Sequence, residues 1–109
     1  MIKNKELIFT KQAEDDLHSI YDYIKNNDSA DAAQKIYYSI KDKCTKLKSF
    51  SNIGHIPPEL EILSIYNYFE INFKPYRIIY NITKREVIIF GIFDGRRNLS
   101  DILAKRLLK

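Results

Sequence analysis

The sequence has little cysteine and histidine: one cysteine, Cys44, and two histidines, His18 and His55, among 109 residues. A single cysteine cannot form a disulfide within the chain. Without a Cys-x-x-Cys pair, these three side chains do not make a zinc site. We therefore expect no metal, and nothing in the sequence calls for another cofactor. With only three glycines and three prolines, the chain also lacks the composition of a disordered protein.

Long apolar segments are absent as well. No apolar run approaches the roughly 18 residues that a membrane-spanning helix needs, and the first residues lack the apolar region of a signal peptide. Hydrophobic residues make up 45% and charged residues 29%, as in ordinary soluble domains. We expect a single domain over residues 1–109, located in the cytoplasm and without a membrane partner.

Positive charge is concentrated in the second part of the chain. Residues 1–65 hold nine Lys or Arg and ten Asp or Glu, whereas residues 66–109 hold nine and four. All five arginines lie in the second part: Arg77, Arg85, Arg96, Arg97 and Arg106. Because a guanidinium pairs well with phosphate or carboxylate, this pattern predicts an anionic partner, with a solvated basic surface as the alternative.

The N-terminal half predicts a short strand over residues 5–9 and then a helical hairpin. Thr10 is placed to cap the first helix. Apolar residues recur after it at helical spacing, and they predict one buried stripe, with Asp15 and Asp16 facing away from it.

The second helix follows closely. Asp28 or Ser29 can cap it, and its apolar stripe includes Cys44, which we interpret as a small buried residue. Residues 51–64 then break the helical pattern with Gly54 and a proline pair, and they predict a loop with one helical turn.

The C-terminal half changes to the patterning of strands. Three segments rich in aromatic and β-branched residues, 66–73, 76–83 and 87–93, predict strands joined by short turns. Asn98 is placed to cap a final helix. Its apolar stripe is Leu99, Ile102, Leu103, Leu107 and Leu108.

This order predicts an α+β fold. The N-terminal strand and helical hairpin pack on a twisted antiparallel sheet of about four strands, with a C-terminal helix. The other face of the sheet is expected to be open or partly covered.

Several segments in this order resemble the RelE/ParE toxin superfamily of type II toxin–antitoxin modules. They are AEDDLHSIYDYI and AAQKI in the hairpin, KPYRIIYNI and VIIFGIFDGRR in the sheet, and NLSDILAKRLL at the end. The resemblance implies a RelE/ParE-like fold and a growth-arrest toxin associated with plasmid stabilisation. It also implies a cognate antitoxin that holds the toxin inactive in a hetero-oligomeric complex.

The resemblance leaves the target open. ParE-like members poison DNA gyrase, and the long hairpin and the C-terminal segment slightly favour that reading. RelE-like members are metal-independent endonucleases that cut mRNA on the ribosome, and PYRIIY favours them. A non-toxic, antitoxin-binding member of the family is the third alternative.

Metal-independent RNA cleavage needs a base, an acid and cations that stabilise the phosphorane. By resemblance, Arg77 matches the strand arginine that contacts the scissile phosphate in the nuclease members. Arg97, beside Arg96, matches the second phosphate-contacting arginine. In the structural alternative these arginines pair with carboxylates of their own chain, namely Glu70, Asp94 or Asp101.

The acid and base are less well matched. Where the nuclease members have a lysine pair, this sequence has Tyr68 and Glu70, and near Leu103 it lacks their tyrosine or histidine. Other nuclease members use a glutamate before the second strand, a role that Glu59 or Glu61 could fill, with His55 nearby.

The same basic residues form the predicted binding surface for phosphate or for an antitoxin: Arg77, Arg96, Arg97 and Lys74. A disordered acidic antitoxin segment could fold across this surface and the apolar C-terminal helix. Its carboxylates would then bury Arg77 and Arg97, which would neutralise either activity.

Overall fold

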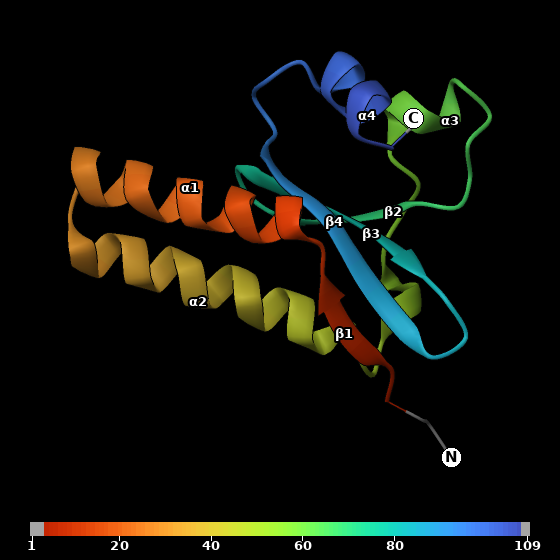
Figure 1. Cartoon of the computed structure of the whole chain (residues 1–109), viewed down its shortest axis with the longest axis horizontal. Helices are drawn as coiled ribbons and strands as arrows, with labels where there is room; N and C mark the ends of the chain where they lie inside the picture. The colour runs from red at the N-terminus through yellow and green to blue at the C-terminus, as the bar shows by residue number, and fades with distance from the viewer. Residues whose placement is uncertain (1–3, 108–109) are drawn as a thin grey trace.

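The computed structural model describes residues 4–107, so Leu108 lies outside the described residues (Figure 1). The elements in chain order are β1 (Glu6–Phe9), α1 (Lys11–Asn27), α2 (Ala30–Lys46), the 3₁₀ turn η1 (Ser51–Ile53), α3 (Pro58–Glu61), β2 (Phe69–Phe73), β3 (Tyr76–Ile82), β4 (Glu86–Asp94) and α4 (Leu99–Leu107). None of the helices in residues 4–107 is both long and apolar enough to cross a membrane.

The four strands form one sheet in the order β1-β4-β3-β2. The predicted α+β class is confirmed, but the sheet is mixed rather than wholly antiparallel. The meander β2-β3-β4 is antiparallel, whereas β1 runs parallel to β4. No short turn joins β1 to β4, since the hairpin and two strands lie between them, so their relative direction is not fixed by a turn.

Helices cover both faces of this sheet. The hairpin α1–α2 packs on one face, where Leu17 and Ile40 meet Ile78 and Tyr80 of β3 in the larger core. Because side chains alternate along a strand, Ile79 points to the opposite face. There it joins a second core of Leu60, Phe93, Leu99 and Leu103. Helices α3 and α4 thus lie side by side over the face that we expected to be open or partly covered (Figure 1).

A β-bulge changes which side chains of β4 face the helical hairpin. Ile79 pairs with Gly91 but Tyr80 pairs with Ile89, so Phe90 is an extra residue. The insertion shifts the alternation by one residue, and Ile89 and Ile92 therefore both face the hairpin.

Strand β2 begins at Phe69, three residues later than the predicted start at residue 66. The intervening chain is still held by α3, because Ile65 N–H donates to the Leu60 carbonyl at 2.9 Å. The segment before α3 also reaches the sheet edge, where His55 forms an isolated bridge with Glu70. This bridge places α3 over the meander.

The predicted helix caps are confirmed. Thr10, Ser29 and Asn98 each accept a hydrogen bond from a backbone N–H two or three residues later. Of the two candidates for the second helix, Ser29 rather than Asp28 is the cap. Cys44 is fully buried, and this burial raises the pKa of its thiol to about 12. It is a packing residue and not an activated nucleophile.

Candidate functional site

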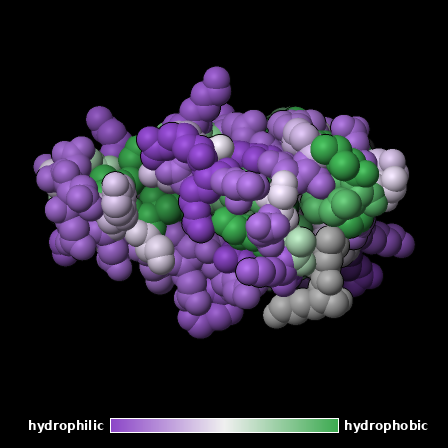
Figure 2. All heavy atoms as spheres, turned by 90° about the horizontal axis from the view of Figure 1, so that it is seen from above, coloured by the Kyte–Doolittle hydropathy of each residue, from purple (hydrophilic) through white to green (hydrophobic). Residues whose placement is uncertain are grey.

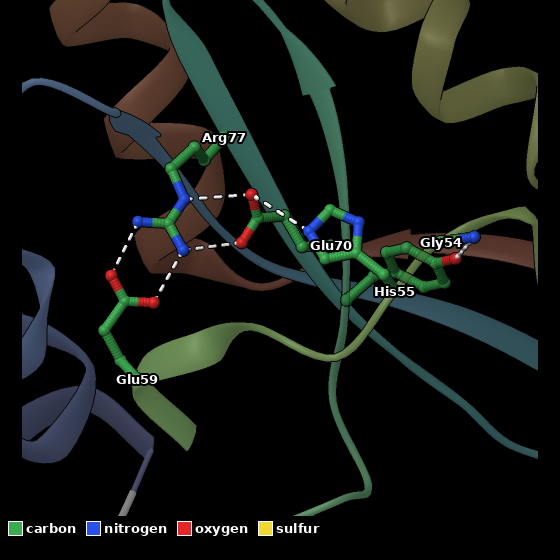
Figure 3. Close-up of polar contacts among 6 residues, drawn as sticks. Gly54, His55, Glu59, Glu70 and Arg77 are labelled. Atoms are coloured by element: carbon green, nitrogen blue, oxygen red, sulfur yellow. Dashed lines mark hydrogen bonds and ion pairs between the residues drawn. The ribbon is translucent and has the colours of Figure 1, made fainter. Parts of the chain in front are cut away.

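The Arg77 guanidinium lies between two carboxylates of its own chain (Figure 3). Its Nε and Nη2 donate to the two Glu70 oxygens at 2.9 and 2.6 Å. Its Nη1 and Nη2 donate to the two Glu59 oxygens at 2.7 Å each. The exposed fractions of the side chains are 15% for Arg77, 21% for Glu59 and 4% for Glu70. We call Glu59, Glu70 and Arg77 the Arg77 clamp.

Three elements position the clamp. Glu70 of β2 lies diagonal to Arg77, which pairs with Asn72 across the β2–β3 ladder. Glu59 comes from α3, which Leu60 anchors to the second core with 1% exposure. At the edge of the sheet, the backbone of His55 exchanges two hydrogen bonds, of 3.1 and 2.7 Å, with the backbone of Glu70.

The clamp carries more negative than positive charge, one guanidinium against two carboxylates. The hydrogen bonds from Arg77 hold the pKa of Glu59 below its usual value, and the contact with Glu59 raises the pKa of Arg77. His55 Nε2 lies 3.7 Å from Glu70 Oε2 with a side chain that is half exposed. With Nε and both Nη atoms engaged, Arg77 presents no vacant edge to a phosphate while Glu59 is in place.

Replacing Glu59 with glutamine tests how much the clamp contributes to stability. The pKa of Glu59 is lower in the folded chain than its value of about 4.5 in the unfolded chain. The ionised Glu59 carboxylate therefore stabilises the fold above about pH 4.5, and this contribution decreases as the pH falls below that value. We expect Glu59→Gln to lower the free energy of unfolding by about 1 kcal/mol near neutral pH, with a smaller difference near about pH 3. Urea unfolding at both pH values measures it.

The matched control is Glu61→Gln, because Glu61 lies on the same helix, is exposed and makes no side-chain hydrogen bond within the described residues. It should change the stability by less than about 0.5 kcal/mol. Equal effects of the two variants would show that the clamp does not hold α3.

The turn after β4 lies beside the clamp. A Cβ added at Gly95 would come within 2.8 Å of the Pro75 carbonyl oxygen and 3.1 Å of Arg77 Cδ. In this turn Arg96 pairs with Asp94 at 2.5 Å, which lowers the pKa of Asp94 to about 2. That pairing is one of the two alternatives predicted for Arg96.

The remaining predicted cations are exposed. Neither Arg97 nor Lys74 has a side-chain hydrogen bond or ion pair within residues 4–107. Two positions correspond by resemblance to catalytic side chains of the nuclease members. At these positions Leu103 is buried, and the Tyr68 ring packs edge-on against the Phe90 ring. Glu61 is exposed and lies outside the clamp.

An ion pair that the sequence did not predict joins α1 to α4. Asp16 accepts from Arg106 Nη1 at 2.5 Å and from the backbone N–H of Ile92 at 3.0 Å. The prediction that Asp16 faces away from the core was therefore wrong. A signal was present, because Asp16 stands three residues after Ala13 and one before Leu17, within the stripe that faces the sheet.

The uneven charge of the chain is balanced in part by internal ion pairs. Three of the five arginines, Arg77, Arg96 and Arg106, pair with carboxylates of the same chain. Two of those carboxylates, Asp16 and Glu59, come from the acidic first part. The number of arginines alone therefore overestimates how many guanidinium groups are free to bind an external anion.

In residues 4–107 no three His, Cys, Asp or Glu side chains gather in a way that could hold a metal ion. The chemistry available at the Arg77 clamp is that of arginine, carboxylate and the exposed imidazole of His55.

Comparison with known proteins gives one family. The family profile described as "ParE toxin of type II toxin-antitoxin system, parDE" matches residues 7–99. A search of curated proteins finds no significant match.

Two solved structures are similar in fold. A chain of the "Chromosomal ParDE TA system from P. aeruginosa" is 21% identical, with a TM-score of 0.70, over 83% of this chain and 95% of that one. A chain of the toxin–antitoxin complex RelBE2 from Mycobacterium tuberculosis is 18% identical, with a TM-score of 0.62, over 86% of this chain and 94% of that one. The arrangement of strands and helices is thus that of both kinds of toxin.

Proposed function

The chain belongs to the family of ParE toxins of type II toxin–antitoxin systems, and from this membership we propose that it arrests growth by binding DNA gyrase and is neutralised by a cognate antitoxin. In this proposal it is a protein ligand and not a nuclease. The two similar structures, described as a ParDE system and a RelBE2 toxin–antitoxin complex, support the antitoxin as a partner.

The ion pairs of Arg77 with Glu59 and Glu70 are the observation that favours gyrase over the ribosome as the target. Ribonuclease action would require this arginine to stabilise a phosphorane whose negative charge is growing. Its donors are instead held by Glu59 and Glu70 at 2.6 to 2.9 Å. A phosphate approaching the clamp would meet two carboxylates, which disfavours RNA binding there.

The surrounding residues support the same choice. Tyr68 and Leu103 stand where the nuclease members carry a lysine and a tyrosine or histidine, and Leu103 is buried in the second core. A protein ligand of gyrase needs none of these groups, since it performs no proton transfer of its own.

The nuclease remains the second candidate because one observation favours it. The His55 imidazole, a side chain that often serves as a general acid or base, lies 3.7 Å from the Glu70 carboxylate that binds Arg77. This candidate requires Glu59 to leave Arg77 before RNA binds.

The test is to induce the protein alone in a bacterial host and to follow DNA and protein synthesis by pulse labelling. We expect DNA synthesis to stop first, with a DNA-damage response and filamentous cells. Protein synthesis that stops first would overturn the proposal in favour of the nuclease. Growth without any arrest would favour the non-toxic alternative.

A further inference from the structure

Three large apolar side chains are exposed where α3 ends. Their exposed fractions are 84% for Ile62, 54% for Leu63 and 56% for Tyr66. We call these three residues the apolar tip. Figure 2 shows a cluster of hydrophobic atoms at the end of the molecule where α3 lies in Figure 1. Exposed apolar side chains gathered so closely indicate a surface that another molecule covers.

We propose that the apolar tip anchors the toxin to gyrase by entering an apolar pocket that has a basic residue at its rim. The inference rests on the proposed function, because it names the surface through which the chain holds that target. The tip is separate from the Arg77 clamp, although the clamp helps to place it.

The backbone at the end of α3 holds the tip in a fixed direction. The N–H groups of Ile65 and Ser64 donate to the carbonyls of Leu60 and Glu61, both at 2.9 Å. Ser64 has a φ of 60°, in the left-handed region that residues other than glycine seldom adopt. The chain turns there, so that Ile65 packs against the second core while the tip stays exposed.

Two contacts hold α3 itself in place. Leu60 is only 1% exposed and lies in the second core. Glu59, on the same helix, accepts two hydrogen bonds of 2.7 Å from Arg77. Because the tip is ordered before it meets a partner, binding loses little conformational entropy. Apolar anchors of this kind supply much of the affinity at protein–protein interfaces.

The charge beside the tip defines the chemistry of the pocket. Glu61 precedes the tip, is exposed and makes no side-chain hydrogen bond within the described residues. Residues 58–68 contain no lysine or arginine. A nucleic acid would therefore bring its phosphates to Glu61 without a cation from this segment. A lysine or arginine of a protein partner can instead pair with Glu61 while Ile62 enters the pocket.

Two other protein partners fit the tip less well. In a two-fold contact between copies of this chain the same patch meets itself, so Glu61 of one copy would face Glu61 of the other. An acidic antitoxin segment would likewise place its carboxylates beside Glu61. The target surface carries neither restriction, because it can supply a pocket of complementary shape and charge.

The first test compares two exposed isoleucines. Ile62 belongs to the tip, whereas Ile53 is 63% exposed and lies in η1. The measurement is the protein concentration that half-inhibits supercoiling of relaxed plasmid by purified DNA gyrase. Ile62→Ser should raise this concentration by about tenfold or more, and Ile53→Ser by less than about threefold. Because both side chains are exposed, urea unfolding should show that both variants stay folded.

The second test compares two exposed tyrosines and removes the charge. Tyr66 belongs to the tip, whereas Tyr38 of α2 is 66% exposed and lies elsewhere. In the same assay Tyr66→Ala should raise the half-inhibiting concentration by about tenfold, and Tyr38→Ala should leave it within about threefold. Glu61→Gln, which is expected to keep the stability of the fold, should raise it by about threefold.

The outcomes separate the anchor from the proposed function. If the wild-type chain inhibits gyrase and the tip variants inhibit it equally well, the tip is not the anchor, and the proposed function stands. If the wild-type chain does not inhibit gyrase, the proposed function fails and the anchor fails with it.

Two further readouts assign the tip to another partner if the proposal is wrong. One is binding of the variants to the purified antitoxin, and the other is the oligomeric state in gel filtration. Tip variants that still inhibit gyrase but lose the antitoxin, or that turn a wild-type dimer into a monomer, would overturn the assignment to gyrase.

Discussion

Replacing Arg77 with alanine should lower the free energy of unfolding by about 3–5 kcal/mol, the largest effect expected of any single substitution discussed for this protein. The change removes the guanidinium but leaves the Glu70 carboxylate, which is only 4% exposed. A buried charge without its partner is strongly destabilising, and His55 at 3.7 Å is the closest ion-pair partner that remains in the described structure. Urea unfolding monitored by circular dichroism measures the loss.

Arg97→Ala is the control, because Arg97 is exposed and has no internal partner among the described residues. It should change the stability by less than about 0.5 kcal/mol. If Arg77→Ala unfolds at the same urea concentration as Arg97→Ala, the clamp does not stabilise the fold.

A third variant separates folding from function. Replacing the clamp by apolar residues, with Glu59→Leu, Glu70→Leu and Arg77→Met together, should restore much of the stability, because no buried charge is left unpaired. If this variant folds, the proposed function predicts that it still arrests growth. Loss of toxicity in Arg77→Ala alone therefore says nothing about catalysis, since that variant is expected to be poorly folded.

The second large effect is expected at Asp16. Asp16→Ala removes the acceptor for the Ile92 N–H and the partner of Arg106, both in a half-buried region between α1, β4 and α4. We expect the free energy of unfolding to fall by about 2–3 kcal/mol. Unfolding by urea is again the measurement.

The neighbouring Asp15 is the matched control. It pairs only with Lys11 one turn away on the surface, where its side chain is 57% exposed. Such pairs contribute little, so Asp15→Ala should cost less than about 0.5 kcal/mol. Equal costs at Asp15 and Asp16 would show that the contact between α1 and β4 is not a stabilising one.

Local signals predicted most of the elements. Period-3.6 patterning marked the hairpin, and Thr10 and Ser29 marked its helix starts, because caps act within three residues of themselves. Arg77 could be placed on the face opposite Tyr76 and Ile78 by alternation alone. The pairing with Glu70 was among the alternatives for the same reason, since adjacent strands of a meander bring such side chains together.

Local sequence patterns could not predict the contacts between segments that lie far apart in the chain. Glu59 reaches Arg77 only because His55 bridges to β2 and Leu60 anchors α3 in the second core. The parallel pairing of β1 with β4 and the bulge at Phe90 likewise depend on how the whole sheet packs. Two adjacent aspartates, Asp15 and Asp16, look alike in sequence and differ only in what the folded chain places beside them.

The most direct test of the central claim uses purified components. The protein is added to DNA gyrase in a supercoiling assay and, in parallel, to ribosomes stalled on a defined mRNA. We expect the protein to inhibit supercoiling and to leave the mRNA intact. Cleavage of the mRNA on the ribosome, with gyrase unaffected, would contradict it and would mean that Glu59 releases Arg77 for catalysis.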